Sequence, residues 1–216
     1  MSARPLVCVV EGDGEVEAIP LLVARMLRHF KRDRRLTVDP QRILNTRGGG
    51  RLTAPFDASL RRGVEFYARI AARDNPGAIL VLIDAEDRCM TRPAGQESLG
   101  PELLRRARSV TGEIPLGVVV ANRMFESWFL ADFHSLRSRR HLPANASLAA
   151  WRAPETLGGC KGWMESLLGR KYNEPVDQPT FTRVVSLPLR PAMQRRAPSY
   201  ARLLRVVDRL SREARS

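Results

Sequence analysis

Short apolar runs alternate with longer amphipathic segments over the first 132 residues, and this alternation is the strongest constraint on the fold. Strands are predicted at residues 5–11, 36–45, 78–84 and 115–121. Helices, with apolar residues at helical spacing, are predicted at residues 15–31, 57–73, 100–110 and 123–132. Such an alternation implies a parallel sheet with right-handed crossovers. We therefore expect an α/β fold with a parallel, Rossmann-like four-stranded sheet and flanking helices.

The pattern changes after residue 132. Proline and glycine break residues 133–216 into short segments, and an amphipathic helix is predicted near residues 199–213. We expect residues 1–132 to form the α/β domain and residues 133–216 to form a helical C-terminal extension packed on it.

Composition argues against several classes of protein. No stretch has the roughly 20 apolar residues that a membrane helix needs, and the N-terminal residues lead into a strand rather than a secretory signal. The three cysteines are too few and too scattered for a disulfide framework or a zinc site. We expect a cytoplasmic protein with no membrane association, and its oligomeric state stays open.

A net charge of +13 favours a phosphate polymer as the partner. Arg47 and Arg51 flank three glycines in a predicted flexible loop, and Lys161 follows two glycines and a cysteine. These three side chains are candidates for holding a nucleic-acid backbone, and Lys161 is also a candidate for stabilising a leaving group. A solvated arginine-rich surface, with Lys161 as an ordinary surface lysine, is the alternative.

Two acidic clusters each follow a predicted buried strand. The first contains Glu11 and Glu15, and the second is Asp84, Glu86 and Asp87. The carboxyl ends of parallel strands share one edge of a sheet, so clusters far apart in sequence can meet there. Converging carboxylates repel each other unless a cation lies between them, and hard oxygen ligands favour Mg²⁺ or Mn²⁺. The sequence therefore predicts a divalent-metal site at this edge.

Several of these residues also have simpler explanations. Glu15 could stabilise the first turn of its helix, Asp84 could cap the segment after its strand, and Asp87 could pair with a neighbouring arginine. Glu126 lies on a predicted helix among aromatic residues, where it could be solvated or paired with a nearby arginine. Glu11 ends an apolar strand, where an unpaired carboxylate would be costly, so metal ligation is the better explanation there.

Glu11-Gly12 after the first strand and Asp84-Ala85-Glu86 after a later strand resemble the Toprim domain of topoisomerases, primases, recombination proteins and OLD-type (overcoming lysogenization defect) nucleases. A longer set of segments is similar to a Toprim-like family of unknown function. That family is related to the OLD nucleases and is often encoded beside ATPases of the kind that partner them. The likeness spans nearly the whole chain. The segments that carry it are residues 11–15, 84–87, 121–129, 161–163, 172, 177–178 and 198–200.

The resemblance implies that Glu11, Asp84 and Glu86 hold a Mg²⁺ ion. Glu86 stands where the family usually has aspartate. Its extra methylene moves the carboxylate oxygen, so Asp87 is an alternative ligand. Candidates for a second ion are Glu15 and Glu126.

The function that follows is Mg²⁺-dependent hydrolysis of DNA or RNA phosphodiesters, in a phage-defence or DNA-processing system with an ATPase partner. The predicted catalytic residues are Glu11, Asp84, Glu86 and Lys161. Two rival hypotheses stay open. A non-catalytic subunit could bind nucleic acid or the ATPase while its acidic cluster is degenerate. A receiver-like phosphoryl-transfer domain could use Asp84 as phosphoacceptor, although no serine or threonine follows the fourth predicted strand.

Overall fold

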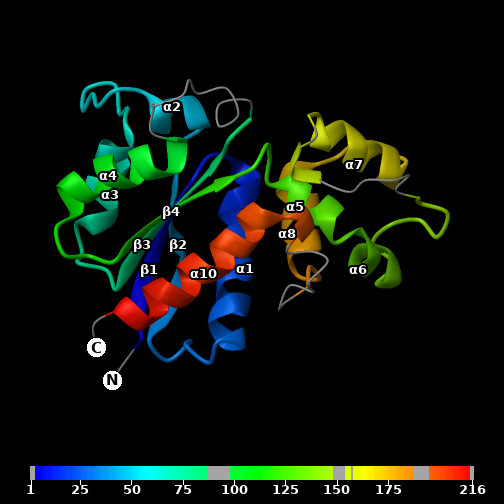
Figure 1. The fold of residues 1–216 in the computed structure, drawn as a ribbon, viewed down its shortest axis with the longest axis horizontal. Helices are drawn as coiled ribbons and strands as arrows, with labels where there is room; N and C mark the ends of the chain where they lie inside the picture. Colours follow the sequence, from blue (N-terminus) through cyan, green and yellow to red (C-terminus); the bar gives the residue numbers. More distant parts are fainter. Residues whose placement is uncertain (1–2, 87–97, 148–153, 157, 187–194, 215–216) are drawn as a thin grey trace.

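The fold is built on a four-stranded parallel sheet with the order β2-β1-β3-β4 (Figure 1). The computed structural model describes residues 3–86, 98–147, 154–156, 158–186 and 195–214. The strands are β1 (Arg4–Val10), β2 (Leu36–Asn45), β3 (Ala78–Asp84) and β4 (Leu116–Ala121), and every neighbouring pair is parallel. The predicted α/β class and parallel sheet are therefore confirmed.

Helices cover both faces of this sheet, which explains why its central strands are almost continuously apolar. The two faces of β3 show the strand's period of two: Leu80 and Leu82 face one core, while Ile79, Val81 and Ile83 face the other. The first core also holds α1 (Asp13–His29) and α10 (Pro198–Glu213). The second core holds α3 (Val64–Ala72) and α4 (Leu99–Thr111).

The last helix, α10, lies across the sheet against β4 and beside α1 (Figure 1). Its approach to β4 is close, because a Cβ added at Gly117 would lie 2.4 Å from Val206 Cγ1. Residues predicted to end the C-terminal extension thus form part of the helical layer that covers the sheet.

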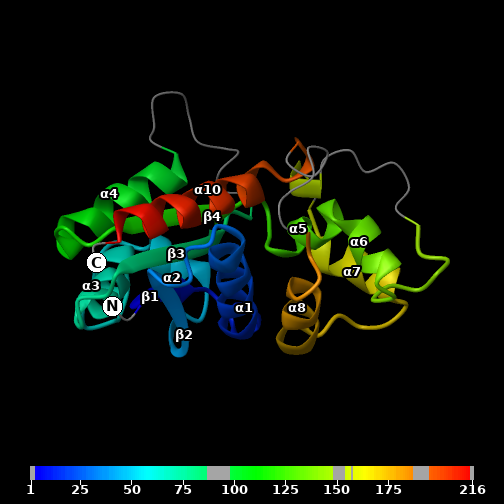
Figure 2. The same ribbon diagram turned by 90° about the horizontal axis from the view of Figure 1, so that it is seen from below.

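The remaining helices of residues 126–182 gather on the far side of α1 from α3 and α4 (Figure 2). Aromatic side chains join this group to the first core: Phe125 contacts Trp128 and Phe129, and Trp128 contacts Tyr200. None of the helices in the described part of the chain combines the length and apolarity of a transmembrane segment. The elements of this group are α5 (Glu126–Ala131), α6 (Phe133–Ser138), η2 (Pro154–Thr156), α7 (Cys160–Leu168) and α8 (Glu174–Thr182).

Two predicted helices have different bounds in the structure. The helix predicted at 57–73 begins at Val64, because residues before it form a turn closed by an antiparallel bridge between Asp57 and Arg62. The helix predicted at 123–132 ends at Ala131 and is followed by α6. Asp132, at this junction, accepts hydrogen bonds from the Ser135 hydroxyl and the Ser186 backbone N–H. At the start of α3 and at the end of α5, local polar contacts therefore limit the length of the helix.

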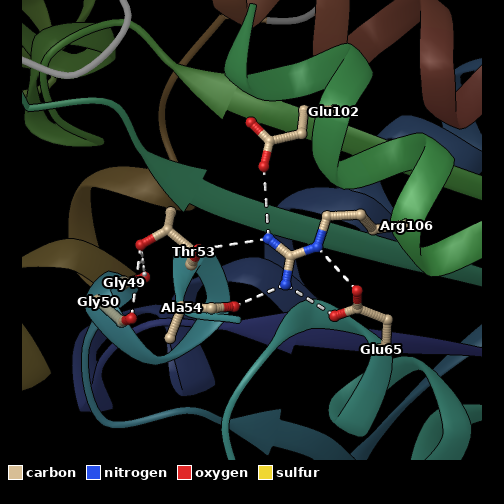
Figure 3. A network of polar contacts seen from close by, with 7 residues as sticks. All are labelled: Gly49, Gly50, Thr53, Ala54, Glu65, Glu102 and Arg106. Atoms are coloured by element: carbon tan, nitrogen blue, oxygen red, sulfur yellow. Dashed lines mark hydrogen bonds and ion pairs between the residues drawn. The ribbon is translucent and has the colours of Figure 1, made fainter. Parts of the chain in front are cut away.

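The predicted flexible loop Arg47–Arg51 is also different. Its second half belongs to a short helix, α2 (Gly49–Thr53). Arg106 of α4 holds this helix from its carboxyl end, as Figure 3 shows. The guanidinium donates hydrogen bonds to the carbonyl oxygens of Thr53 (3.3 Å) and Ala54 (2.6 Å) and pairs with Glu65 of α3 at 2.8 Å. The segment between β2 and α3 is therefore fixed to two helices of the second core.

Candidate functional site

The two acidic clusters meet where β1 and β3 end. Glu11 Oε1 accepts a hydrogen bond of 2.7 Å from the backbone N–H of Asp84, which lies 73 residues away in sequence. Asp84 Oδ1 in turn accepts a 3.0 Å bond from the backbone N–H of Phe125, just beyond β4. The strands β1, β3 and β4, which are adjacent in the sheet, thus bring polar groups together at its carboxyl edge.

A cavity of about 550 Å³ opens at this point, and carboxylates dominate its lining. Two basic residues, Arg47 and Lys161, also line it. The acidic lining residues are Glu11, Asp13, Glu15, Asp84, Glu86 and Glu174. We call this the acidic cavity.

The backbone of α2 closes over Glu11. A Cβ added at Gly49 would lie 2.4 Å from Glu11 Oε1, so only glycine fits there without moving the carboxylate. The backbone N–H of Gly48 also donates a 2.8 Å bond to the Glu11 carbonyl oxygen. Because Arg106 holds the other end of α2, the glycine segment is an ordered cover for this carboxylate.

The carboxylates of the cavity disfavour one another's charge. Burial, and then the nearby charges of Glu126, Glu11 and Glu15, raise the pKa of Asp84 well above its ordinary value, while Lys161 acts in the opposite direction. Burial is also the main cause of the raised pKa of Glu15, to which Glu126 and Glu174 add. Among the described residues, the charge of Lys161 therefore offsets only part of the burial and carboxylate repulsion that act on Asp84.

Behind the acidic cavity, Glu126 is fully buried rather than solvated. Its Oε1 accepts a 2.9 Å hydrogen bond from Gln178 Nε2, and burial raises its pKa. Within the described part of the chain, Glu126 Oε2, Glu15 Oε2 and Gln178 Oε1 are buried without a hydrogen-bond partner. Orphaned buried oxygens of this kind are costly and uncommon.

Lys161 lies in the first turn of α7 and forms a 2.7 Å ion pair with Glu174 of α8. Burial alone would lower its pKa, but the bond to Glu174 and the charges of Glu126 and Asp84 raise it. This side chain is therefore a stable cation at the rim of the acidic cavity.

The other predicted site residues have distinct places. Exposed Glu86 lines the cavity with a left-handed backbone (φ 50°), and Arg47 lines it from the β2 side. Arg51 lies outside it, in a neighbouring cavity. Asp87 lies outside the described residues.

The donors of the cavity suit a hard divalent cation, because they are mostly carboxylate oxygens, and one of them, Glu15 Oε2, is buried without a hydrogen-bond partner among the described residues. Among the described residues, however, no three histidine, cysteine, aspartate or glutamate side chains form a group that could hold a metal ion. The residues therefore match the chemistry of a Mg²⁺ or Mn²⁺ site without a completed set of ligands.

Sequence reasoning gave Gln178 no role, although it lies in one of the segments that carry the family resemblance. The sequence predicted that Ser199 caps the last helix, but it did not predict the buried network around this residue. Its hydroxyl accepts hydrogen bonds from Trp128 Nε1 (2.8 Å) and the Asn122 backbone N–H (3.1 Å), and Glu155 accepts from the Ser199 backbone N–H and Asn122 Nδ2. This network ties the start of α10 to the residue that follows β4.

Together, these features define an α/β protein with a carboxylate-lined cavity at the carboxyl edge of a parallel sheet. No protein-family model matches the chain, and no curated protein matches it. Among solved structures, the C-terminal region of the Burkholderia pseudomallei OLD protein is similar, with 17% identity, a TM-score of 0.46 and coverage of 99% of both chains. The C-terminal region of the Xanthomonas campestris pv. campestris OLD protein is also similar, with 15% identity, a TM-score of 0.40 and coverage of 98% of this chain and 95% of that chain. The strand order and the helical layers define the fold independently of these likenesses.

Proposed function

We propose that this protein is a Mg²⁺- or Mn²⁺-dependent nuclease of the Toprim/OLD type that hydrolyses phosphodiester bonds of DNA or RNA. The observation that carries the proposal is the convergence of Glu11 and Asp84 at one sheet edge, where burial and then neighbouring carboxylates raise the pKa of Asp84. A cluster of this kind costs folding free energy unless a cation offsets the repulsion. Its presence therefore supports a function that needs the cation.

Glu11, Asp84 and Glu86 would hold one ion, with Asp87 as a further candidate, and Glu15 and Glu126 would serve a second ion. When bound, a divalent metal supplies charge neutralisation at the phosphate and activation of a water molecule. Gln178 orients Glu126 through the bond to Oε1. The backbone N–H of Phe125 fixes one oxygen of Asp84 and leaves the other available.

The basic residues complete this assignment. Lys161 and Arg47 line the same cavity as the carboxylates, so a phosphate over the acidic cluster lies within their electrostatic reach. In this role they hold a substrate phosphate and offset charge on the departing oxygen. Contacts of this kind carry little sequence preference. From the family resemblance given above, we propose that the activity belongs to a phage-defence or DNA-processing system with an ATPase partner.

The test compares the full chain with Asp84→Asn on plasmid and single-stranded substrates in the presence of Mg²⁺ or Mn²⁺. Asparagine keeps an oxygen for the Phe125 N–H but removes the charge, so we expect hydrolysis to fall by about 100-fold or more. An exposed carboxylate outside the site gives a matched control, Asp33→Asn, which should retain activity. Calorimetric titration with Mg²⁺ gives a readout that does not depend on turnover. Equal hydrolysis by wild type and Asp84→Asn would remove the proposal.

A non-catalytic subunit that binds nucleic acid or an ATPase is the second candidate. It is favoured by the absence, among the described residues, of a completed group of three metal-ligating side chains. Mg²⁺ affinity distinguishes the two functions, because a nuclease should lose at least tenfold in affinity with Glu11→Gln. A non-catalytic subunit should show no hydrolysis and no difference between the two proteins in Mg²⁺ titrations.

A further inference from the structure

A second cavity of about 570 Å³ lies between the end of β2 and helix α3, beside the acidic cavity. Four arginines from three segments line it, and all four are exposed. Within the described residues, none of these guanidinium groups forms an ion pair with a carboxylate. Four cations around one hollow, without a direct ion pair among the described residues, attract a polyanion. The four residues are Arg47, Arg51, Arg61 and Arg73, and we call the hollow the basic cavity.

One wall of the basic cavity is apolar. Ile43 and Leu44 contribute from β2, and Phe66, Tyr67 and Ile70 contribute from α3. Phe66 and Ile70 are partly exposed, so they present an uncovered apolar and aromatic surface. A hollow of this volume with an apolar wall and convergent polar groups has the usual character of a small-ligand site.

The local backbone holds this cavity in shape. Arg47 and Arg61 both have left-handed backbones, with φ of 56° and 53°, which is unfavourable for residues other than glycine. The hydroxyl of Tyr67 donates a 3.1 Å bond to the Arg61 carbonyl oxygen. The bridge between Asp57 and Arg62 closes the same turn. Contacts from several elements therefore maintain two unfavourable conformations that place arginines around one hollow.

Asn45 connects the two cavities. Its Nδ2 donates a 2.7 Å bond to Asp13 Oδ1 at the acidic cavity, and its Oδ1 accepts a 2.7 Å bond from the backbone N–H of Arg47. Both Asn45 and Arg47 line both cavities. A polymer bound in one cavity can therefore continue directly into the other.

We propose that the basic cavity binds one unpaired nucleotide of a single-stranded nucleic acid, with its phosphate on the arginines and its base against Phe66 and Ile70. Bases of a duplex are stacked on both faces, so an apolar side wall can be used only by a base that is unpaired. This inference deepens the proposed function, on whose nucleic-acid substrate it rests. The nucleotide bound here neighbours the phosphate that the acidic cavity would hydrolyse.

The test measures binding without hydrolysis, by fluorescence anisotropy in EDTA. The probes are a labelled single strand of roughly 12 nucleotides and the duplex of the same sequence. We expect the wild type to bind the single strand more tightly. The double variant Arg61→Gln/Arg73→Gln should weaken that binding about tenfold and lower the slope of log K against log[salt] by roughly 0.7 for each phosphate that is no longer neutralised. Phe66→Leu should weaken single-strand binding about fivefold and leave the salt slope unchanged.

The matched control removes the same charge elsewhere. Arg34 and Arg108 are exposed and do not line the basic cavity, so Arg34→Gln/Arg108→Gln should change single-strand affinity by less than about twofold. The inference is overturned if the duplex binds as tightly as the single strand, or if this control weakens binding as much as the cavity variant. Arg61 and Arg73 are exposed, so their variant carries the test even if Phe66→Leu does not fold. Single-strand binding in a protein that hydrolyses nothing would remove the proposed function and leave this inference standing.

Discussion

Glu65 and Asp84 are acidic residues that lie near the same parallel sheet, and their pKa values are shifted in opposite directions. Burial would raise the pKa of Glu65, but hydrogen bonds from Arg106 outweigh it and the pKa is lowered. The pKa of Asp84 is raised, by burial first and then by other carboxylates. Basic residues are not scarce, since Lys and Arg number 36 against 23 Asp and Glu. The network around Arg106 is thus a site of charge compensation, whereas at Asp84 the cations of the described residues do not outweigh burial and carboxylate repulsion.

This contrast implies different energetic roles. In the Arg106 network each charged group has a partner, so removing one of these side chains should mainly lower the free energy of unfolding. In the acidic cavity the carboxylates repel one another, which opposes folding. Removing one of these charges should therefore mainly lower the proposed hydrolytic activity rather than stability. The predictions below test each side of this comparison.

The largest effect on stability should come from Arg106→Met. The side chains of Arg106 and Glu65 are 13% and 15% exposed, so the variant leaves a largely buried carboxylate unpaired and frees the carbonyl oxygens of Thr53 and Ala54. We expect the free energy of unfolding to fall by roughly 3 kcal/mol in urea denaturation. Arg108→Met, at an exposed position of the same helix, should change it by less than about 0.5 kcal/mol. Similar losses for both variants would contradict a special role for this network.

A smaller effect, on hydrolysis, is expected from substitution of the glycines of α2. This helix covers Glu11 at one end and is held by Arg106 at the other. Gly49→Ala brings a Cβ within 2.4 Å of Glu11 Oε1 and must displace the carboxylate. We expect hydrolysis to fall about tenfold, which corresponds to about 1.4 kcal/mol in the barrier. Gly50→Ala is the matched control, because nothing lies within 4 Å of its added Cβ. That variant should keep full activity and gain about 0.5 kcal/mol of stability, and equal activities would show that the cover over Glu11 has no functional role.

The smallest effect concerns pH. The folded-state pKa of Glu65 is lowered, so its contribution to stability is present above the unfolded-state pKa, near 4.3, and is lost as the pH falls toward the folded-state value. The comparison is with the apolar double variant Arg106→Met/Glu65→Leu, which lacks this pair. Between about pH 7 and pH 3, the unfolding free energy of the wild type should fall by about 1 kcal/mol more than that of the double variant. Urea denaturation at both pH values measures it. A difference that stays constant with pH would show that the pair contributes nothing through charge.

The sheet could be predicted from the sequence because each strand is marked by the apolar pattern of its own few residues. The predicted bounds of β2 and β3 are those of the structure, and the others are within about a residue or two. The meeting of Glu11 and Asp84 followed from one rule, that parallel strands share their carboxyl edge. Each prediction needed only the apolar pattern of a strand and the residue at its end.

The features that sequence reasoning missed depend on contacts between distant residues. The glycine segment before α3 reads as flexible on its own, and its order comes from Arg106, more than 50 residues later. Gln178 and Glu155 have ordinary sequence surroundings, and their roles appear only when α8 packs against α1 and η2 packs against α5. The basic cavity is similar, because its arginines come from three segments that the structure brings together.

The position of α10 has a consequence for biosynthesis. Leu203, Val207 and Leu210 are fully buried in the first core, so one face of the sheet lacks part of its cover until residues 198–213 have left the ribosome. Translation that stops before this helix would release a chain with exposed apolar surface, which is prone to aggregation and is a target for chaperones and proteases. Completion of this core therefore waits for residues 198–213, although three strands of the sheet are synthesised within the first 84 residues.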